Sequence, residues 1–126
     1  MAMRPPKGGI RNEMREKAMR EEILAQLGAL LADAGVELVA CKDTYVGDYL
    51  TGKADALAVA MQMVEAKALI ETMTCFLRHE ETRNMNLAES ARLCSNDMMA
   101  RIYEGKAAGY MVALRVVTEV REMNES

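Results

Sequence analysis

The sequence predicts an all-α protein, a four-helix bundle-like domain with one irregular or extended segment near residues 36–51, and we expect it to be oligomeric. Apolar residues recur at helical spacing over most of the 126 residues. They are mainly Leu, Ala, Val and Met, with 12 methionines and no tryptophan, which favours helices over strands. Only two prolines interrupt the chain, and only one short stretch has strand character. A chain of this length forms one domain, which we place at residues 12–126.

Residues 1–11 are predicted to precede that domain as a flexible basic arm, because their Pro-Pro and Gly-Gly pairs oppose regular structure. The candidate partner-binding residues of the arm are Arg4, Lys7 and Arg11. Residues 1–20 carry six bases and two acids, a net charge of +4, so the rest of the chain carries −7 within a total of −3. Non-specific affinity for nucleic acid comes mainly from basic side chains that neutralise phosphates. The acidic body therefore argues against nucleic-acid binding as the main role, and the arm leaves a limited contact open.

The first helix is predicted to begin at Asn12, a favourable N-cap, and to end near residue 34. Gly35 follows at the position where a left-handed cap would end the helix. Residues 36–41 form a short stretch with β-branched side chains, which predicts an extended segment. Such a segment is either a buried loop or a strand that pairs with its copy in another subunit. Residues 42–51 are turn-rich.

The second helix is predicted from about residue 53 to residue 79 or 83, after a cap at Asp48 or Thr51. Between residues 56 and 64 only Gln62 is polar. A helix without a polar face has to be covered on every side, so this one is either central or at a subunit interface. We expect that a single copy of the chain cannot cover it.

The third helix is predicted to begin at a capping box, Asn86 to Glu89, and to run through Tyr103. Gly105 is expected to break or kink the chain. The fourth helix then runs from about residue 106 to residue 123. Short connections between these helices predict antiparallel neighbours.

Two stretches of the chain are nearly the same. Gly52-Lys53-Ala54 and Gly105-Lys106-Ala107 open apolar runs that match at 6 of 13 positions when shifted by 53 (105 minus 52). Small residues four positions apart share a helix face, so we expect another backbone to approach closely there, either between these two helices or from a symmetry mate. The candidate interface residues are Gly52, Ala56, Leu57, Ala60, Met61, Val64, Gly105, Gly109, Tyr110 and Ala113.

The same two starts have an alternative interpretation as a binding site for an anionic group. Lys53 and Lys106 would then lie beside the N-termini of their helices, where phosphates bind. Neither start matches the pattern of a phosphate-binding loop, so packing is the favoured interpretation.

No catalytic residue, cofactor or metal ion is predicted. Cys75 and His79 are four residues apart, and Cys41 and Cys94 could complete a tetrahedral zinc site. The chain has no Cys-x-x-Cys pair and no second histidine, so buried free thiols are the favoured interpretation. The Glu-x-x-Glu half of a magnesium-binding pattern occurs at residues 13–16 and 119–122, but the Glu-x-x-Asp half is missing.

The cysteines and the N-terminus predict a cytoplasmic protein. Three widely spaced cysteines and no signal peptide favour a reducing compartment. The most apolar window is expected at residues 54–77, and five polar or charged residues interrupt it, so no membrane partner is predicted.

The leading hypothesis for function is a non-enzymatic helical binding protein. It would self-associate, most simply as a dimer, and act by occupying or bridging a macromolecular partner, another protein first of all. Compact accessory proteins of phages and mobile elements, including anti-CRISPR-like inhibitors of host defence complexes, share this general character, although no motif identifies a family. The alternatives are a nucleic-acid-associated regulator that uses the basic arm and a magnesium-dependent all-α nucleotide hydrolase.

Overall fold

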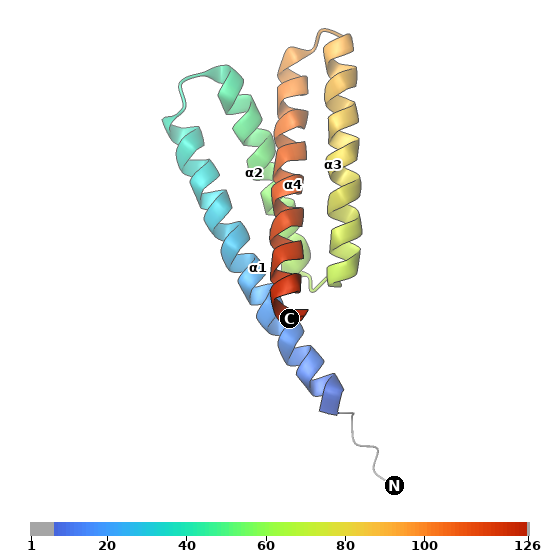
Figure 1. Cartoon of the computed structure of the whole chain (residues 1–126). Coiled ribbons are helices and arrows are strands. Elements are labelled where there is room, and N and C mark those ends of the chain that lie inside the picture. Colours follow the sequence, from blue (N-terminus) through green and yellow to red (C-terminus); the bar gives the residue numbers. More distant parts are fainter. Residues whose placement is uncertain (1–6, 126) are drawn as a thin grey trace.

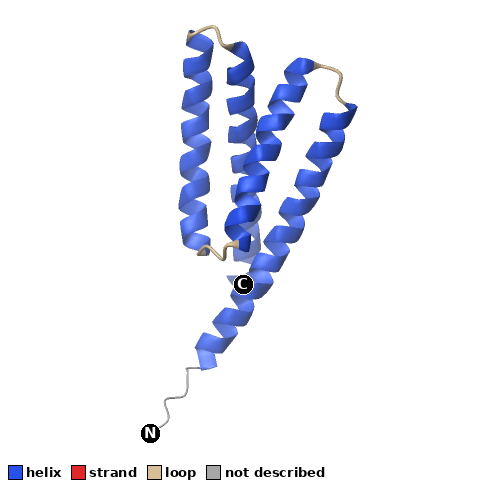
Figure 2. Cartoon of the chain, turned by 180° about the vertical axis from the view of Figure 1, so that it is seen from behind, coloured by secondary structure: helices blue, strands red, loops and turns tan. Residues whose placement is uncertain are grey.

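The predicted all-α class is confirmed by a computed structural model, which describes residues 7–125 and the side chains of residues 12–125 (Figure 1). Four helices pack together as a bundle-like fold: α1 (Lys7–Ala40), α2 (Thr44–Glu65), α3 (Ile70–Leu93) and α4 (Asp97–Glu125). Figure 2 shows helices and short loops, and no strand, in this described part of the chain.

The helices form two antiparallel hairpins, α1–α2 and α3–α4, that pack side by side (Figures 1 and 2). The inner helices α2 and α4 run in the same direction and make the most extensive contact between any two helices. The outer helix α1 packs on α2 and reaches α4, whereas α3 packs mainly on α4. Within the described residues, α1 and α3 do not pack on each other.

The core lies where all four helices meet. Its largest fully buried side chains come from every helix and are at most 1% exposed: Ile23, Leu27, Leu57, Val64, Met73, Leu77, Val117 and Val120. The apolar stretch at residues 56–64 is therefore covered by the chain itself, since α2 is enclosed between α1 and α4. The expectation that a single copy cannot cover this helix is wrong.

The two hairpins are structural repeats of each other. The inner helices begin at Thr44 and Asp97, 53 residues apart (97 minus 44), and the outer helices end at Ala40 and Leu93, also 53 apart (93 minus 40). This spacing equals the spacing of the Gly-Lys-Ala repeat. The repeated sequence thus belongs to a repeated helical hairpin, which extends well beyond the 13 matching positions.

The N-caps of the inner helices recur at the same spacing. Asp43 Oδ1 accepts a hydrogen bond of 2.8 Å from the backbone N–H of Tyr45, and Asn96 Oδ1 accepts one of 3.2 Å from that of Met99. Each cap satisfies a backbone donor that the first turn of a helix leaves unpaired. Asp43 and Asn96 are 53 residues apart (96 minus 43), so each hairpin has the same device at its turn.

The irregular segment predicted near residues 36–51 is helical except at residues 41–43. The helix α1 continues through Gly35, which has no positive φ, and ends at Ala40. The cap of α2 is Asp43 rather than Asp48 or Thr51. The β-branched side chains that favoured a strand stand on the exposed side of α1, where they do not crowd a neighbouring element.

The long second helix predicted to reach residue 79 or 83 is also wrong, because α2 ends at Glu65. Lys67 has φ 60°, its N–H donates to the carbonyl of Val64 at 3.0 Å, and the N–H of Ala68 donates to that of Met63 at 3.1 Å. These are the two hydrogen bonds of a left-handed helix cap, formed here without glycine.

Two further predicted boundaries lie inside helices. Asn86, the expected start of the third helix, is in the middle of α3, and Gly105, the expected break, is in the middle of α4. The start of α3 is set instead by the short connection from residue 66 to residue 69. Arg20 of α1 holds this connection, since its Nη2 donates to the carbonyls of Lys67 and Ala68 at 3.3 and 3.4 Å.

The predicted basic arm coincides in part with α1. This helix begins at Lys7, so the backbone of residues 7–11 is helical. Arg4 and the side chains of Lys7 and Arg11 lie outside the described part of the structure.

Candidate functional site

The repeated Gly-Lys-Ala starts meet where α2 crosses α4. A Cβ atom on Gly52 would collide with the carbonyl oxygen of Ile102, and one on Gly105 would collide with that of Tyr49. Gly109 lies against the backbone of α2 in the same way. Ile102 follows Tyr49 by 53 residues (102 minus 49), so each half of the crossing repeats the other. The prediction that another backbone approaches these glycines is confirmed, and that backbone belongs to the same chain.

The other predicted interface residues are occupied within this fold. The buried ones are Ala56, Leu57, Ala60, Val64, Tyr110 and Ala113, at most 6% exposed. Met61 is half-buried, and its Cε lies 3.7 Å from the position of a Cβ on Gly28 of α1. Side chains that one chain already covers cannot also be buried against a second copy. In this arrangement the buried members of the predicted interface are packed within one copy, so they are not exposed to a second.

The alternative anion site at Lys53 and Lys106 lacks its structural basis. Because α2 begins at Thr44 and α4 at Asp97, each lysine is nine residues inside its helix (53 minus 44, 106 minus 97). Only the first turn of a helix presents free N–H groups. Lys106 Nζ lies 5.9 Å from the centre of the Tyr103 ring, a contact along the same helix.

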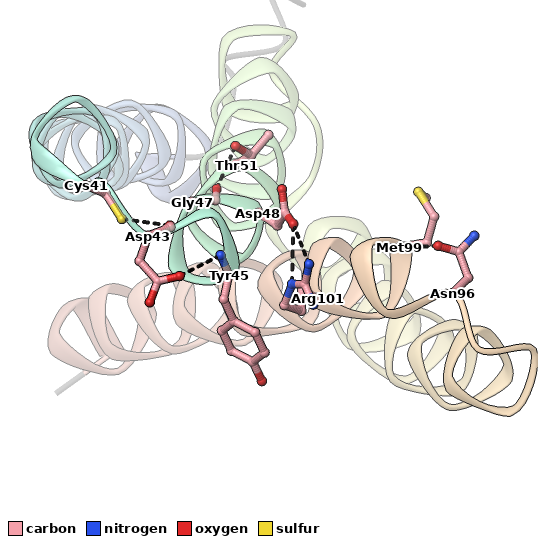
Figure 3. A network of polar contacts seen from close by, with 9 residues as sticks. All are labelled: Cys41, Asp43, Tyr45, Gly47, Asp48, Thr51, Asn96, Met99 and Arg101. Carbon is pink, nitrogen blue, oxygen red and sulfur yellow. Dashed lines mark hydrogen bonds and ion pairs between the residues drawn. The ribbon is translucent and has the colours of Figure 1, made fainter.

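An ion pair joins the two inner helices next to the glycine crossing (Figure 3). Arg101 Nη2 and Nε donate to Asp48 Oδ2 at 3.0 and 3.3 Å, and both side chains are about four-fifths buried. The Arg101 guanidinium also lies 4.7 Å from the centre of the Tyr45 ring. Asp48 and Arg101 are equivalent positions of the two hairpins (101 minus 48 is 53). Two identical charges facing each other there would repel, whereas the opposite charges fix the crossing.

The cysteines and His79 do not come together, and the prediction that the thiols are buried is wrong, since Cys75 and Cys94 are exposed and Cys41 is half-buried. Cys41 and Cys94 lie at the equivalent turns of the two hairpins, and Cys75 and His79 are exposed on α3. Cys41 Sγ donates to the carbonyl of Asp43 at 3.1 Å. Across residues 12–125, no three His, Cys, Asp or Glu side chains are close enough together to hold a metal ion.

Tyr110 of α4 is buried in the core of the bundle, 6% exposed. Burial raises the pKa of its phenol above the ordinary value of 10.0, and the nearby carboxylate of Glu80 raises it further. The ring packs edge-on against Phe76, with 6.2 Å between ring centres. The phenol is therefore a neutral part of the core at physiological pH.

The surface missed from the sequence is the outer face of α1, which we define as Ala25, Ala29, Ala32, Val36 and Val39. Their spacing of four, three, four and three residues places them in one stripe along the helix. All five are exposed, Val36 by 70% and Val39 by 89%. Toward the N-terminus the exposed Glu21 interrupts the stripe, and Ala18 and Met14 lie on the same side of the helix beyond it, the latter 68% exposed.

The opposite side of α1 explains why this stripe faces outward. Ile23, Leu27 and Ala34 point into the bundle and are at most 3% exposed. Since α1 lies at the edge of the fold and packs only on α2 and α4, half of its circumference has no neighbour. A helix in this position ordinarily has charged and polar residues on its free side.

The second hairpin provides a control for this interpretation. The residues 53 positions beyond the outer face of α1 are Arg78, Thr82, Met85, Glu89 and Arg92, all exposed and four of them polar. The outer helix of one hairpin is thus solvated in the usual way, while that of the other exposes an apolar stripe.

No family model, curated protein or solved structure matches the chain.

The apolar character of α1 has a second consequence. By length and composition alone, Asn12–Ala40 contains a window that could cross a membrane, and 17% of that window is buried in the fold. The prediction that the most apolar window lies at residues 54–77 is wrong, since Asn12–Ala40 is the one described helix that meets this condition.

Proposed function

We propose that this chain is a non-enzymatic helical binding protein that self-associates through the outer face of α1 and acts by occupying or bridging a macromolecular partner. The observation that carries the proposal is the exposed apolar stripe on α1, at positions where the equivalent helix α3 is polar. Burying a valine side chain completely is worth about 1.5–3 kcal/mol. A two-fold dimer would bury Val36 and Val39 twice, once from each copy.

A dimer formed on this face suits a bridging protein. The face lies on the side of α1 away from the bundle, so pairing leaves α2, α3 and α4 of each copy uncovered. Two copies of every other surface are then available to a partner. Partners with two or more sites bind such a dimer more tightly than a monomer, because the second contact is intramolecular.

The narrower expectations from the sequence stay predictions: a partner in a host defence complex, a cytoplasmic location and a nucleic-acid contact through the arm. The hydrolase alternative is tested by phosphate release from nucleoside triphosphates with magnesium. Nucleic-acid binding is tested by its dependence on salt, which should be lost when residues 1–11 are deleted.

Light scattering of the purified chain tests the proposal directly. We expect a mass of about 28 kDa, twice the chain mass of 14.0 kDa. Ala29→Glu places a charge in the stripe and should reduce the mass to that of one chain, because an unpaired charge is costly to bury. Thr82→Glu is the matched control, since it introduces a glutamate at the equivalent exposed position on α3. This variant should stay dimeric.

Two results would contradict the proposal. One is a wild-type monomer at about 100 µM, a concentration at which association with a micromolar Kd is nearly complete. The other is a dimer that Ala29→Glu and Thr82→Glu leave equally intact. Circular dichroism of both variants establishes that each is folded, so that a lost dimer is not mistaken for a lost fold.

A further inference from the structure

We infer that the α1 helices of two copies pair antiparallel, with the two-fold axis near Ala25, so that the basic N-terminal part of each α1 lies along the acidic remainder of the other. The inference rests on the proposed self-association and adds the identity, direction and register of the partner helix. It is carried by the charges of α1, by their relation to the helix dipole and by the exposed stripe.

The charges of α1 are divided along its length. Residues 7–20 contain five bases and two acids, a net charge of +3. Residues 21–40 contain four acids and no base, a net charge of −4. Parallel pairing would place like charges together in both halves, whereas antiparallel pairing places opposite charges together in both. Complementary charge of this kind selects the orientation of a pair of helices.

This division of charge opposes the dipole of the helix itself. Acidic side chains stabilise the N-terminus of a helix and basic ones its C-terminus. The helix α1 has no acid in its first turn and no base in its last turn. Among the bases of α1 within residues 12–125, only Arg20 has contacts that account for its place, with Glu16 and with the carbonyls of Lys67 and Ala68. An antiparallel neighbour accounts for the division of charge, because each end of α1 then lies beside the opposite charges and the opposite dipole end of its partner.

The stripe fits one register particularly well. With Ala25 on the axis, Ala18 of one copy lies across from Ala32 of the other, and Met14 from Val36. Ala25 and Ala29 have small side chains near the axis, Glu21 of one copy falls across from Ala29 of the other, and the larger side chains fill the space on either side. The basic residue at position 15 comes near the acidic residues at positions 33 and 37 of the partner, since all three are exposed on the same flank of the stripe.

The length of α1 fits the same arrangement. Its 34 residues span about 51 Å at 1.5 Å each. Its N-terminal part extends beyond the rest of the bundle, as Figure 1 shows, and Met14 there is 68% exposed. The inner side of this segment faces the start of α3 and the end of α4, where Asn12, Arg15 and Glu16 line a cavity, and its outer side has no neighbour among the described residues. In the antiparallel pair this segment lies along the exposed Val36 of the partner, so each copy covers the other.

A lipid surface is the competing occupant of the stripe, and the charges disfavour it. Helices that lie in a membrane interface have basic residues beside their apolar face. Beside the outer face of α1 are Glu21, Glu22, Asp33 and Glu37, with no base after Arg20. Crossing a membrane would in addition require α1 to withdraw the fully buried Ile23 from the core.

Cysteine cross-linking tests direction and register. The background is Cys41→Ser, Cys75→Ser, Cys94→Ser, which removes three thiols that are not buried. Ala25→Cys should form a disulfide dimer on oxidation. Ala18→Cys and Ala32→Cys should form none alone and one when mixed, because a disulfide needs Cα atoms within about 7 Å. Disulfides in Ala18→Cys alone would mean a parallel pair, and disulfides in Ala32→Cys alone would mean another axis; either overturns the inference.

Charge reversal gives an independent test. Asp33→Lys with Glu37→Lys, or Arg15→Glu with Lys17→Glu, should each raise the dimer Kd about ten-fold or more, since two-fold symmetry repeats every lost pair. A mixture of the two variants should restore tight pairing as a heterodimer. In a parallel pair the first variant would leave the Kd unchanged, because repulsion between acids is replaced by repulsion between bases, and that result overturns the inference.

The outcomes separate this inference from the proposed function. A wild-type monomer that does not bind vesicles contradicts both. A dimer that Ala29→Glu disrupts, but whose cross-links are parallel, contradicts the inference and leaves the proposed function standing. Flotation of a wild-type monomer with vesicles of phosphatidylcholine and phosphatidylglycerol shows a lipid occupant and likewise contradicts both.

Discussion

The two helical hairpins are built alike where they touch and differently where they do not. The inner helices share their starts, their N-caps and the glycines at which they cross. The outer helices differ in length, 34 residues in α1 against 24 in α3, and in the polarity of their exposed side. Contact between the repeats therefore constrains the inner helices, while the outer ones are free to diverge. The apolar outer face of α1 is the difference on which the proposed self-association rests.

The largest effect is expected at the glycine crossing. Gly52→Ala and Gly105→Ala should each lower the free energy of unfolding by about 3 kcal/mol, because the added Cβ meets a backbone carbonyl that cannot move alone. Urea denaturation of dilute protein measures this. The two losses should be similar, since the repeated hairpins place both glycines in the same setting.

Gly35→Ala is the control for that pair. A Cβ on Gly35 meets nothing within 4 Å, so the change should stabilise α1 by about 0.5–1 kcal/mol through the lower backbone entropy of alanine. If Gly52→Ala were as well tolerated as Gly35→Ala, the close crossing of α2 and α4 would be refuted.

A smaller effect is expected at the ion pair of the two inner helices. Asp48→Arg alone should lower the free energy of unfolding by about 2 kcal/mol, because two guanidinium groups would then face each other in a partly buried site. Adding Arg101→Asp should recover most of this loss, since the two positions are equivalent. The double variant should remain less stable than the wild type by about 0.5–1 kcal/mol, because it loses the contact of Arg101 with the Tyr45 ring. A double-mutant cycle with no coupling would contradict this account.

The sequence supplied the class of the fold and the place of its closest packing. Helical periodicity and scarce proline were sufficient for four helices, and the Gly-Lys-Ala repeat located the crossing. It could not indicate whether the approaching backbone came from the same chain, because small residues pack equally well within and between chains. The same spacing separates Asp43 from Asn96 and Cys41 from Cys94, which are further signs of the repeat in the sequence.

The helix boundaries failed for a physical reason. Glycine predicts a helix end at Gly35 and Gly105. Gly35 is instead tolerated inside α1, and Gly105 is required for the close approach of α4 to α2. The left-handed caps are at Lys67 and Ser95, and neither residue type predicts a positive φ. The outer face of α1 was missed because ending the helix at Gly35 removed Val36 and Val39 from its stripe.

The turns of the two hairpins allow a finer test of that lesson. Ser95 has φ 58°, whereas its equivalent Lys42 has no positive φ. Ser95→Gly should raise the free energy of unfolding by about 0.5–1 kcal/mol, because glycine adopts this conformation without strain. Lys42→Gly should give no gain and a loss of a few tenths of a kcal/mol, about the entropic cost of glycine at such a site. Thermal denaturation compares the two, and equal shifts would contradict the difference between the turns.

The effect that is smallest at neutral pH concerns Tyr110, whose equivalent in the first hairpin is Leu57 (110 minus 57 is 53). Burial, and then the charge of Glu80, raises the pKa of Tyr110 in the folded state above 10.0. The unfolded chain therefore loses this proton first as the pH rises. The free energy of unfolding falls as the pH rises from 10.0 to the folded pKa of Tyr110, and it stays lowered above that pKa. Tyr110→Phe should remove that part of the alkaline loss, and its difference from the wild type should be constant below pH 9 and change only above it. Melting temperatures from pH 7 to 11, with the exposed Tyr45→Phe as control, measure this. A difference that does not depend on pH would show that the phenol ionises as readily in the fold as outside it.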